Sequence, residues 1–439
     1  MELALKDPGP LKVWTAASVP SLLIFGAMIA GGADNAFLAL LTSSLAAGLL
    51  LIFLMSPGHR RDLARIPNLA PVAVLFLCTL LVAVWSLTPF SPGGTHPVWA
   101  YVPALGAATI ARSQTLIEIL KLCGLAAFFV SGAIMARSEE FGRKARYAVL
   151  AGGVIFALKG LTHVGNGDSV WAGRLTAGLA SPNIAGTALG ILFILAMTTL
   201  GARNSSGRQN RGEKLVFAYA PAAGLMLLFL ACLFLTASRG AIAATGIAAL
   251  VYLGLMLTAR KITLLQGSIA VAALAVIGGG LALTRGTLAL HRFGAVSADT
   301  SARAVLFSVH LAAFQTSPLM GFGLGAFDAI NKLEFTRLNY AAVWNVRAAH
   351  DVYLQWLDEA GLIGAAPMFL CIGLILITTL FLSVGQRRHA RWIRAMLAVD
   401  ALVMIHGATD FALQVPSVAA LWAYLLGLQL GATKPDSGR

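Results

Sequence analysis

The chain has 439 residues, of which 58% are hydrophobic and only 11% are charged. Soluble domains average about 25% charged residues, so this composition excludes a single soluble globular domain and a disordered chain. The formal net charge of +14 would indicate a nucleic-acid partner in a soluble protein. In a helical membrane protein, the same excess follows from the basic residues of cytoplasmic loops. We therefore predict a helical membrane protein that binds no nucleic acid.

Apolar segments of about 20 residues, each long enough to cross a bilayer as a helix, recur along the chain. The predicted fold class is an all-α polytopic membrane protein, with about twelve transmembrane helices in a single membrane domain over residues 1–439. The expected spans are 12–31, 35–55, 70–88, 114–135, 147–163, 183–201, 215–236, 240–258, 263–284, 362–384, 395–412 and 415–431.

The segments that connect these spans alternate in basic content. Clusters such as Arg60, Arg61 and Arg65 fall in every second segment, whereas scattered basic residues such as Arg239 fall in the others. The positive-inside rule places the basic clusters in the cytoplasm. We therefore expect both termini to be cytoplasmic and Arg239 to lie on the exoplasmic side.

One exoplasmic segment, 285–361, is too long for a simple connection and is expected to contain amphipathic helices. Thr300–Thr316 is expected to form one of them on the membrane surface, ended by the GFGLG run of residues 321–325. Another helix is expected to begin near His350 and to end at Gly361. The GFGLG run follows no predicted strand, so its glycines do not indicate a nucleotide-binding loop.

Arginines on the exoplasmic side oppose the positive-inside rule, so a functional role is a candidate explanation for each of them. Arg239 lies in the turn Thr236–Gly240 between two apolar spans, where a charge is costly and usually functional. The planar fork of arginine grips phosphate at two points, which suits a diphosphate. The alternative is that each arginine contacts a lipid headgroup or a local acid. His350 is of the residue type that accepts protons near neutral pH, and its alternative is a surface histidine at a helix start.

The chain contains, in this order, RLTAGLASPN at 174–183, the turn Thr236–Gly240, the stretch 301–323 and the stretch His350–Gly361. These segments, in this order and all on the predicted exoplasmic side, resemble those of the O-antigen ligase and polymerase superfamily. In this chain, Ser181 stands where that superfamily usually has Asn. Asp351 stands where Asn frequently follows the histidine.

The resemblance implies a GT-C-type glycosyltransferase in the inner membrane of a Gram-negative bacterium, with its active site facing the periplasm. The donor would be a glycan on undecaprenyl diphosphate, and the acceptor of the ligase branch would be a sugar hydroxyl of the lipid A-core. By the same resemblance, His350 matches the catalytic histidine, and Arg239 and Arg303 match arginines that hold the diphosphate. Arg174 matches a further member of that group less closely.

These residue types support direct displacement with inversion, in which His350 acts as general base and the arginines stabilise the leaving diphosphate. The chain has no DxD triplet, so we expect no metal requirement and no other cofactor. Asp351 and Asp358 are the carboxylates expected to orient His350; the alternative is that both face water.

The same sequence is compatible with other functions. A polymerase would pass the glycan to another repeat unit, and a protein-glycosylating relative would use a Ser or Thr hydroxyl; the one large exoplasmic loop favours the ligase. A proton-coupled transporter or flippase would use polar groups within the spans, for which the candidates are Asp400, His406 and Asp410. Glu118 and Lys121 lie one turn apart and are expected to pair. A structural scaffold would leave the exoplasmic arginines without a purpose.

Overall fold

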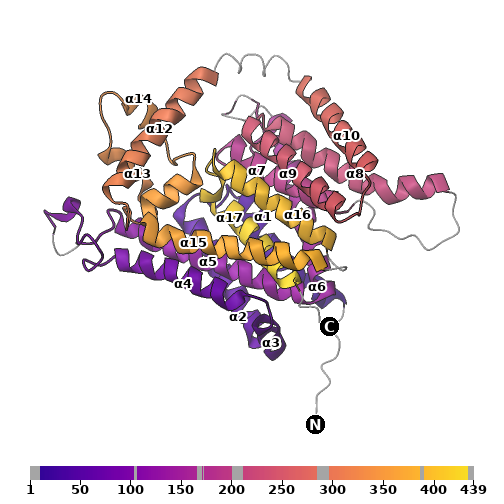
Figure 1. Cartoon of the computed structure of the whole chain (residues 1–439), viewed down its shortest axis with the longest axis horizontal. Coiled ribbons are helices and arrows are strands. Elements are labelled where there is room, and N and C mark those ends of the chain that lie inside the picture. The colour runs from indigo at the N-terminus through magenta and orange to yellow at the C-terminus, as the bar shows by residue number, and fades with distance from the viewer. Residues whose placement is uncertain are drawn as a thin grey trace, which may run out of the picture.

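The computed structural model describes residues 10–102, 106–165, 171, 173–199, 211–283, 296–385 and 390–433. All the regular elements within these ranges are helices, so the all-α class is confirmed (Figure 1). The helices are α1 (Pro10–Ile29), α2 (Ala36–Met55), α3 (Pro57–Ala64), α4 (Leu69–Ser86), α5 (Arg112–Arg137), α6 (Glu139–Gly165), α7 (Pro182–Met197), α8 (Arg211–Leu235), α9 (Arg239–Thr258), α10 (Leu264–Leu283), α12 (Val296–Thr316), α13 (Phe327–Leu333), α14 (Tyr340–Val343), α15 (Val352–Gly385), α16 (Ala390–Gly407) and α17 (Pro416–Ala432). Short 3₁₀ helices lie at η1 (Pro97–Trp99) and η3 (Ala412–Gln414).

Each expected span overlaps one of these helices. Within the described ranges, six helices are long and apolar enough to cross a membrane, and five further apolar helices are shorter. α16 is in neither group; it contains Arg391, Arg394 and Asp400. These helices are those of a multi-pass membrane protein. The expected number of about twelve spans stays a prediction. The terminal segments 1–9 and 434–439, which we expect in the cytoplasm, lie outside the described residues.

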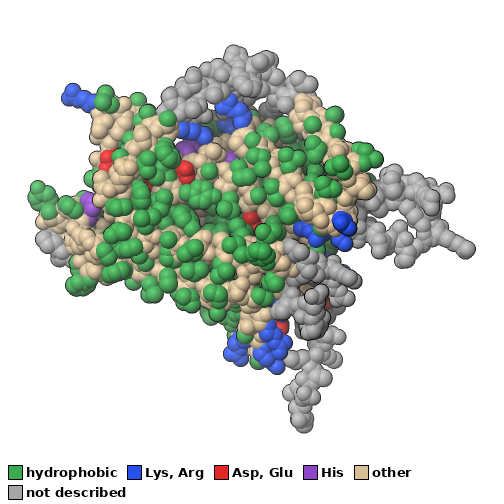
Figure 2. Space-filling model, viewed as in Figure 1, with side chains coloured by type: hydrophobic (Ala, Val, Ile, Leu, Met, Phe, Trp, Pro, Cys, Tyr) green, Lys and Arg blue, Asp and Glu red, His purple; other side chains and the backbone are tan. Residues whose placement is uncertain are grey.

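The outer face of the bundle has the character that a lipid environment requires. Figure 2 shows hydrophobic side chains over most of the visible face, with basic side chains gathered mainly towards its edges. Large apolar side chains such as Phe37, Leu81 and Phe381 are more than two thirds exposed. A contiguous apolar surface of this kind is costly in water and favourable in hydrocarbon.

Small residues allow the central helices to approach closely. α17 contains the sequence Gly427-Leu428-Gln429-Leu430-Gly431, in which the two glycines share one helix face. A Cβ atom at Gly427 would overlap the backbone oxygen of Phe129 on α5, and one at Gly431 would overlap that of Ala133. The α5–α17 contact therefore depends on the absence of side chains at these positions.

The helices α12, α13 and α14 form a separate layer at one end of the bundle (Figure 1). Helix formation over the expected segment Thr300–Thr316 is confirmed, since α12 includes it. The buried His310 of α12 joins this layer to the bundle: its Nδ1 lies 2.6 Å from Asp358 Oδ2 on α15, and its ring stacks on Phe327 of α13. Nε2 of the same ring lies 3.2 Å from Asn331 Oδ1. Arg303 lies about two turns earlier on the same helix α12.

A break in α15 occurs at Gly361, where the sequence predicts a helix end. Gly361 has φ 61° and ψ −176°, a conformation that only glycine adopts without strain. The glycine-rich segment 318–325 closes the break by hydrogen bonding to both sides of it. Backbone N–H groups of Phe322 and Gly323 donate to the carbonyls of Asp358 and Glu359, at 3.0 and 2.7 Å. The GFGLG run, which follows the end of α12 at Thr316, therefore supplies hydrogen-bond partners to α15.

We predict that Gly361→Ala lowers the melting temperature of the purified protein. A Cβ atom there would overlap the backbone oxygen of Leu319, and the backbone conformation alone costs a non-glycine residue about 1–3 kcal/mol. The matched control is Gly373→Ala in the same helix, where a Cβ atom would meet no atom within 4 Å. An unchanged melting temperature for Gly361→Ala would show that the segment 318–325 does not constrain the break.

Candidate functional site

A cavity of about 1540 Å³ lies where the α12–α13 layer meets the ends of the bundle helices. Its lining includes Arg174, Arg239, Arg303 and His350, which the sequence analysis selects from well separated parts of the chain. The structure thus brings these four side chains to one chamber. Their roles in catalysis and binding stay predictions.

Arg239 is the first residue of α9, which follows the sharp turn after α8. The Ser238 side chain caps this helix by accepting the N–H of Ala241, and Ala237 in the turn has a positive φ of 50°. A helix N-terminus bears partial positive charge, and here the exposed Arg239 guanidinium adds a full charge beside it. Both features favour an anion at this point of the cavity.

Arg174 is buried, and its guanidinium supports the same turn by hydrogen bonding to the backbone of the turn. Its Nε donates to Thr236 O at 2.7 Å, and its Nη2 donates to Ala237 O at 3.3 Å. Nη2 also donates to Asn183 Oδ1 at 3.3 Å. These contacts give Arg174 a positioning task for the turn that presents Arg239, in addition to the donor contact that the resemblance implies.

Arg303 reaches the cavity from α12. Its Nη1 donates to Thr409 O at 3.0 Å, in the loop that follows α16. This contact ties the outer helical layer to the residue that precedes Asp410. Arg303 therefore links two walls of the cavity whichever ligand it binds.

His350 precedes α15 and has a positive φ of 55°. Left-handed backbone is uncommon for non-glycine residues, although histidine adopts it more readily than most, and such strain concentrates at functional sites. The imidazole packs edge-on against Phe411, with ring centroids 4.8 Å apart and planes at 87°. Its Nδ1 lies 4.0 Å from Asp410 Oδ2. The backbone and its neighbours thus direct the ring into the cavity.

Asp410 is the carboxylate that faces His350, which corrects the expectation for Asp351 and Asp358. Asp410 is buried, its Oδ2 accepts a 2.7 Å hydrogen bond from Asn183 Nδ2, and its Oδ1 accepts the N–H of Phe411. Asp358 Oδ2 instead pairs with His310, as described above. Asp351 Oδ1 accepts the N–H groups of Tyr353 and Leu354, so this carboxylate caps α15.

Both departures from the superfamily pattern fall on helix caps. The Ser181 side chain accepts the N–H of Asn183 at the start of α7, and Asp351 does the same at the start of α15. Serine, aspartate and asparagine are about equally good at this position because each offers a side-chain oxygen to the first free N–H groups. Replacing Asn by Ser181 or Asp351 therefore preserves the local geometry.

The polar residues that would serve a transporter have well-defined partners. His406 Nδ1 lies 2.8 Å from Thr187 Oγ1, and Asp400 Oδ1 accepts the indole N–H of Trp422 at 2.9 Å. The predicted pair of Glu118 and Lys121 is confirmed, with Oε1 and Nζ 2.6 Å apart. The contacts of His406 and Asp400 connect α16 to α7 and α17, and the pair of Glu118 and Lys121 lies within α5. His406 and Asp410, which the transporter alternative groups together, both line the cavity of the candidate site.

Sequence reasoning missed Asn183 and Asp410 as a pair. They are 227 positions apart, and no local pattern joins them. The spacing of Asp410 four residues after His406 favoured an interaction along one helix, but α16 ends at Gly407 before Asp410 is reached. No group of three or more His, Cys, Asp or Glu side chains in the described part of the chain is arranged to hold a metal ion.

Comparison with known proteins identifies the family to which part of the chain is similar. Residues 224–369 match the model of the O-antigen ligase family, which covers about a third of the chain and includes Arg239, Arg303 and His350. The match supports an O-antigen ligase or polymerase type of function, and it implies an enzyme of the membrane glycosyltransferase kind. No curated protein matches the chain.

We predict that Arg174→Ala lowers the melting temperature more than Arg239→Ala does. The first change leaves the carbonyls of Thr236 and Ala237 without this donor, at a cost of about 1–3 kcal/mol for a buried acceptor. Arg239 is exposed to the cavity, so its removal is expected to change stability little. Equal melting temperatures for the two variants would remove the positioning task from Arg174.

Proposed function

We propose that this chain, which is similar to the O-antigen ligase family over residues 224–369, transfers an O-antigen glycan from undecaprenyl diphosphate to a sugar hydroxyl of the lipid A-core. The reaction takes place on the periplasmic face of the bacterial inner membrane. The observation that carries the proposal is that Arg239, Arg303 and His350 line one cavity. Such a chamber combines cationic groups for a diphosphate with a base for a hydroxyl.

The reaction is a single displacement at the anomeric carbon of the donor sugar. The acceptor oxygen forms the new bond to this carbon while the bond to the diphosphate oxygen breaks, and the electron pair leaves with the diphosphate. His350 takes the proton of the acceptor hydroxyl. Attack from the face opposite the leaving group inverts the anomeric configuration. A general base in this position contributes about 10²–10⁴ in rate.

Stabilisation of the leaving group falls to the arginines. Charge grows on the diphosphate as its bond to the sugar breaks, and Arg239 and Arg303 present permanently charged guanidinium groups to the same cavity. Arg174 contributes by holding the turn that carries Arg239. Fixed donors aimed at developing charge are usually the largest single contribution to catalysis. In this mechanism arginines replace the divalent cation that other glycosyltransferases use.

Asp410 supports His350 as a base. A carboxylate near Nδ1 favours the imidazolium that forms when the other ring nitrogen takes a proton. The Nδ1 to Oδ2 separation of 4.0 Å is longer than a hydrogen bond, and contacts of this kind shorten when substrate binds. Asn183 keeps the carboxylate in place from the far side.

The ligase is preferred to the polymerase because of the exoplasmic segments. The polymerase type often has two sizeable exoplasmic loops, whereas this chain has one long segment, 285–361, and the modest segment 89–113. The polymerase, which would use the same cavity and the same chemistry, is the second candidate.

We predict that His350→Ala lowers the transfer rate by about 10²–10⁴ because no base remains at the acceptor hydroxyl. The assay uses purified protein, a lipid-linked glycan donor and a lipid A-core acceptor, with EDTA present throughout. His59→Ala is the control. His59 lies in α3, its ring contacts the backbone oxygen of Phe53 in α2, and it is not among the residues that line the cavity. Full activity of His350→Ala would exclude this histidine as the base, and loss of wild-type activity in EDTA with rescue by magnesium would contradict the metal-free mechanism.

We further predict that deletion of the gene removes every long-chain band from the lipopolysaccharide ladder while lipid-linked polymer accumulates. This pattern arises because polymer is still made but has no route to the lipid A-core. Gel electrophoresis of lipopolysaccharide, with extraction of the lipid-linked fraction, measures both products. A single-repeat band in place of the ladder would show instead that the chain is the polymerase.

A further inference from the structure

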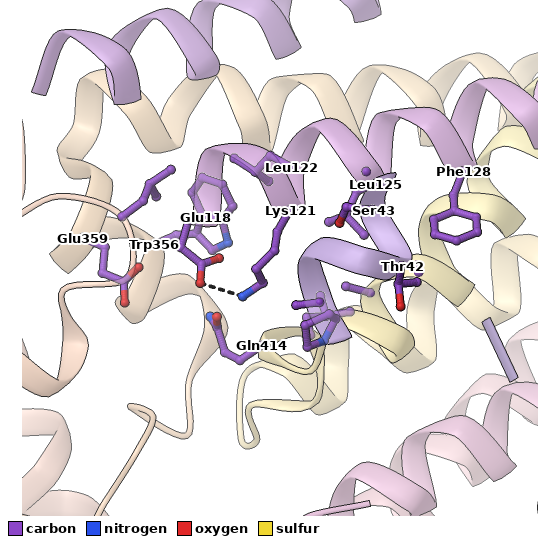
Figure 3. Close-up of a pocket in the computed structure, with 17 residues that line it drawn as sticks. Thr42, Ser43, Glu118, Lys121, Leu122, Leu125, Phe128, Trp356, Glu359 and Gln414 are labelled. Carbon is purple, nitrogen blue, oxygen red and sulfur yellow. Dashed lines mark hydrogen bonds and ion pairs between the residues drawn. The ribbon is translucent and has the colours of Figure 1, made fainter. Parts of the chain in front are cut away.

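A second, smaller pocket of about 70 Å³ adjoins the large cavity between α2, α5, α15 and the start of α17 (Figure 3). Glu118, Lys121, Glu359 and Gln414 line both the pocket and the cavity, so they form the mouth between the two. In Figure 3 these polar side chains gather at one end, whereas Leu125 and Phe128 lie at the other. The proposed mechanism assigns no role to this mouth.

The carboxylates of the mouth are held in fixed positions. Glu359 is almost fully buried; its Oε2 accepts the N–H of Gly325 at 2.7 Å, and its Oε1 accepts the Gln355 amide at 3.0 Å. Glu118 Oε1 pairs with Lys121 Nζ at 2.6 Å (Figure 3). Each carboxyl oxygen has a further lone pair to offer to a ligand hydroxyl, and Lys121 balances the charge of Glu118.

This wall differs in chemistry from the arginine wall. A diphosphate is attracted to Arg239 and Arg303, whereas no arginine of the described residues lines the small pocket, and the charge of Lys121 is already paired with that of Glu118. Carboxylate acceptors, the Gln414 amide and the indole of Trp356 instead suit a ligand with many hydroxyl groups and apolar C–H faces. A sugar ring has both features. The pocket volume is too small for a ring, so the ring would lie in the cavity with one edge or a hydroxymethyl group directed into the mouth.

The contacts of His350 and of its neighbour Ala349 place the imidazole between the two walls. On one side, Asp410 next to the ring is bonded to Asn183, which also accepts from Arg174 of the arginine wall. On the other side, Gln355 Oε1 accepts the N–H of Ala349, the residue before His350, while its amide donates to Glu359 of the acidic wall. A base between a diphosphate subsite and a hydroxyl-binding subsite has the arrangement that in-line displacement requires.

We propose that this mouth, together with Trp356 of the small pocket behind it, is the acceptor-sugar subsite, which binds a hydroxyl-rich ring and directs its nucleophilic hydroxyl to His350. This inference rests on the proposed function, since it assigns the second substrate of that same reaction. Glu359 and Lys121 are positioning residues that fix the mouth, and Glu118, Gln414 and Trp356 contact the sugar.

The test compares Glu118→Gln and Gln414→Ala with the wild-type protein in the transfer assay, varying donor and acceptor separately. Loss of one hydrogen bond to the sugar is expected to raise the KM for the acceptor by about three- to tenfold, with the KM for the donor changed less than about twofold. The matched control is Glu140→Gln, because Glu140 pairs with Lys144 at 2.7 Å in the same kind of helical ion pair and is not among the cavity-lining residues. The two test residues lie on different elements, so misfolding of one variant leaves the other informative.

Binding of core oligosaccharide, freed from its lipid and added without donor, gives a second readout by native mass spectrometry. Weaker binding by both variants than by Glu140→Gln supports the subsite even if the wild-type protein transfers no glycan, which would overturn the proposed function alone. Normal transfer with unchanged acceptor KM in both variants, or a rise confined to the donor KM, overturns the subsite alone. Wild-type protein that neither transfers glycan nor binds the oligosaccharide overturns both.

Discussion

Backbone groups at a helix interruption need hydrogen-bond partners when no water is at hand, and this constraint shapes the whole cavity. The break at Gly361 is closed by the backbone of the segment 318–325. The turn between α8 and α9 is supported by the buried guanidinium of Arg174, and the turn after α16 is bound by Arg303. The interruptions lie next to the cavity, so the groups that satisfy them also form its walls. Side chains that the proposed reaction needs are thereby held by the same contacts that make the interruptions possible.

The cavity is electrostatically uneven, and this unevenness gives the two proposed substrates separate places. Arg239 stands at the N-terminus of α9, where the helix and the guanidinium both attract an anion. The mouth near Glu118 and Glu359 offers hydrogen-bond acceptors to a hydroxyl-rich ring instead. These different preferences hold the two reactants in separate places, which lowers the entropic cost of aligning an acceptor hydroxyl with a donor carbon.

Much of the architecture follows from local sequence alone. Hydrophobic length indicates where each helix lies, and cap residues such as Asn35 and Ser238 mark where some of them start. Gly361 ends a helix where the sequence predicts, because only glycine tolerates its backbone conformation. The caps also explain why Ser181 and Asp351 substitute for asparagine without loss of geometry. These features depend on neighbours within one turn, which a sequence displays directly.

The sequence by itself determined the helical class and the positions of the helices, because hydrophobic length and helix breaks are local properties. It also determined the choice of Arg239, Arg303 and His350 as candidates, because the order of motifs along a chain can be read without knowing how the chain packs. Tertiary structure alone decided that Asp410 rather than Asp358 faces His350, that Arg174 supports a turn, and that Gln414 lies beside Glu118. Helical periodicity defines which residues are neighbours within one helix. It does not define which helices meet, so partners 227 positions apart, such as Asn183 and Asp410, emerge only once the bundle has packed.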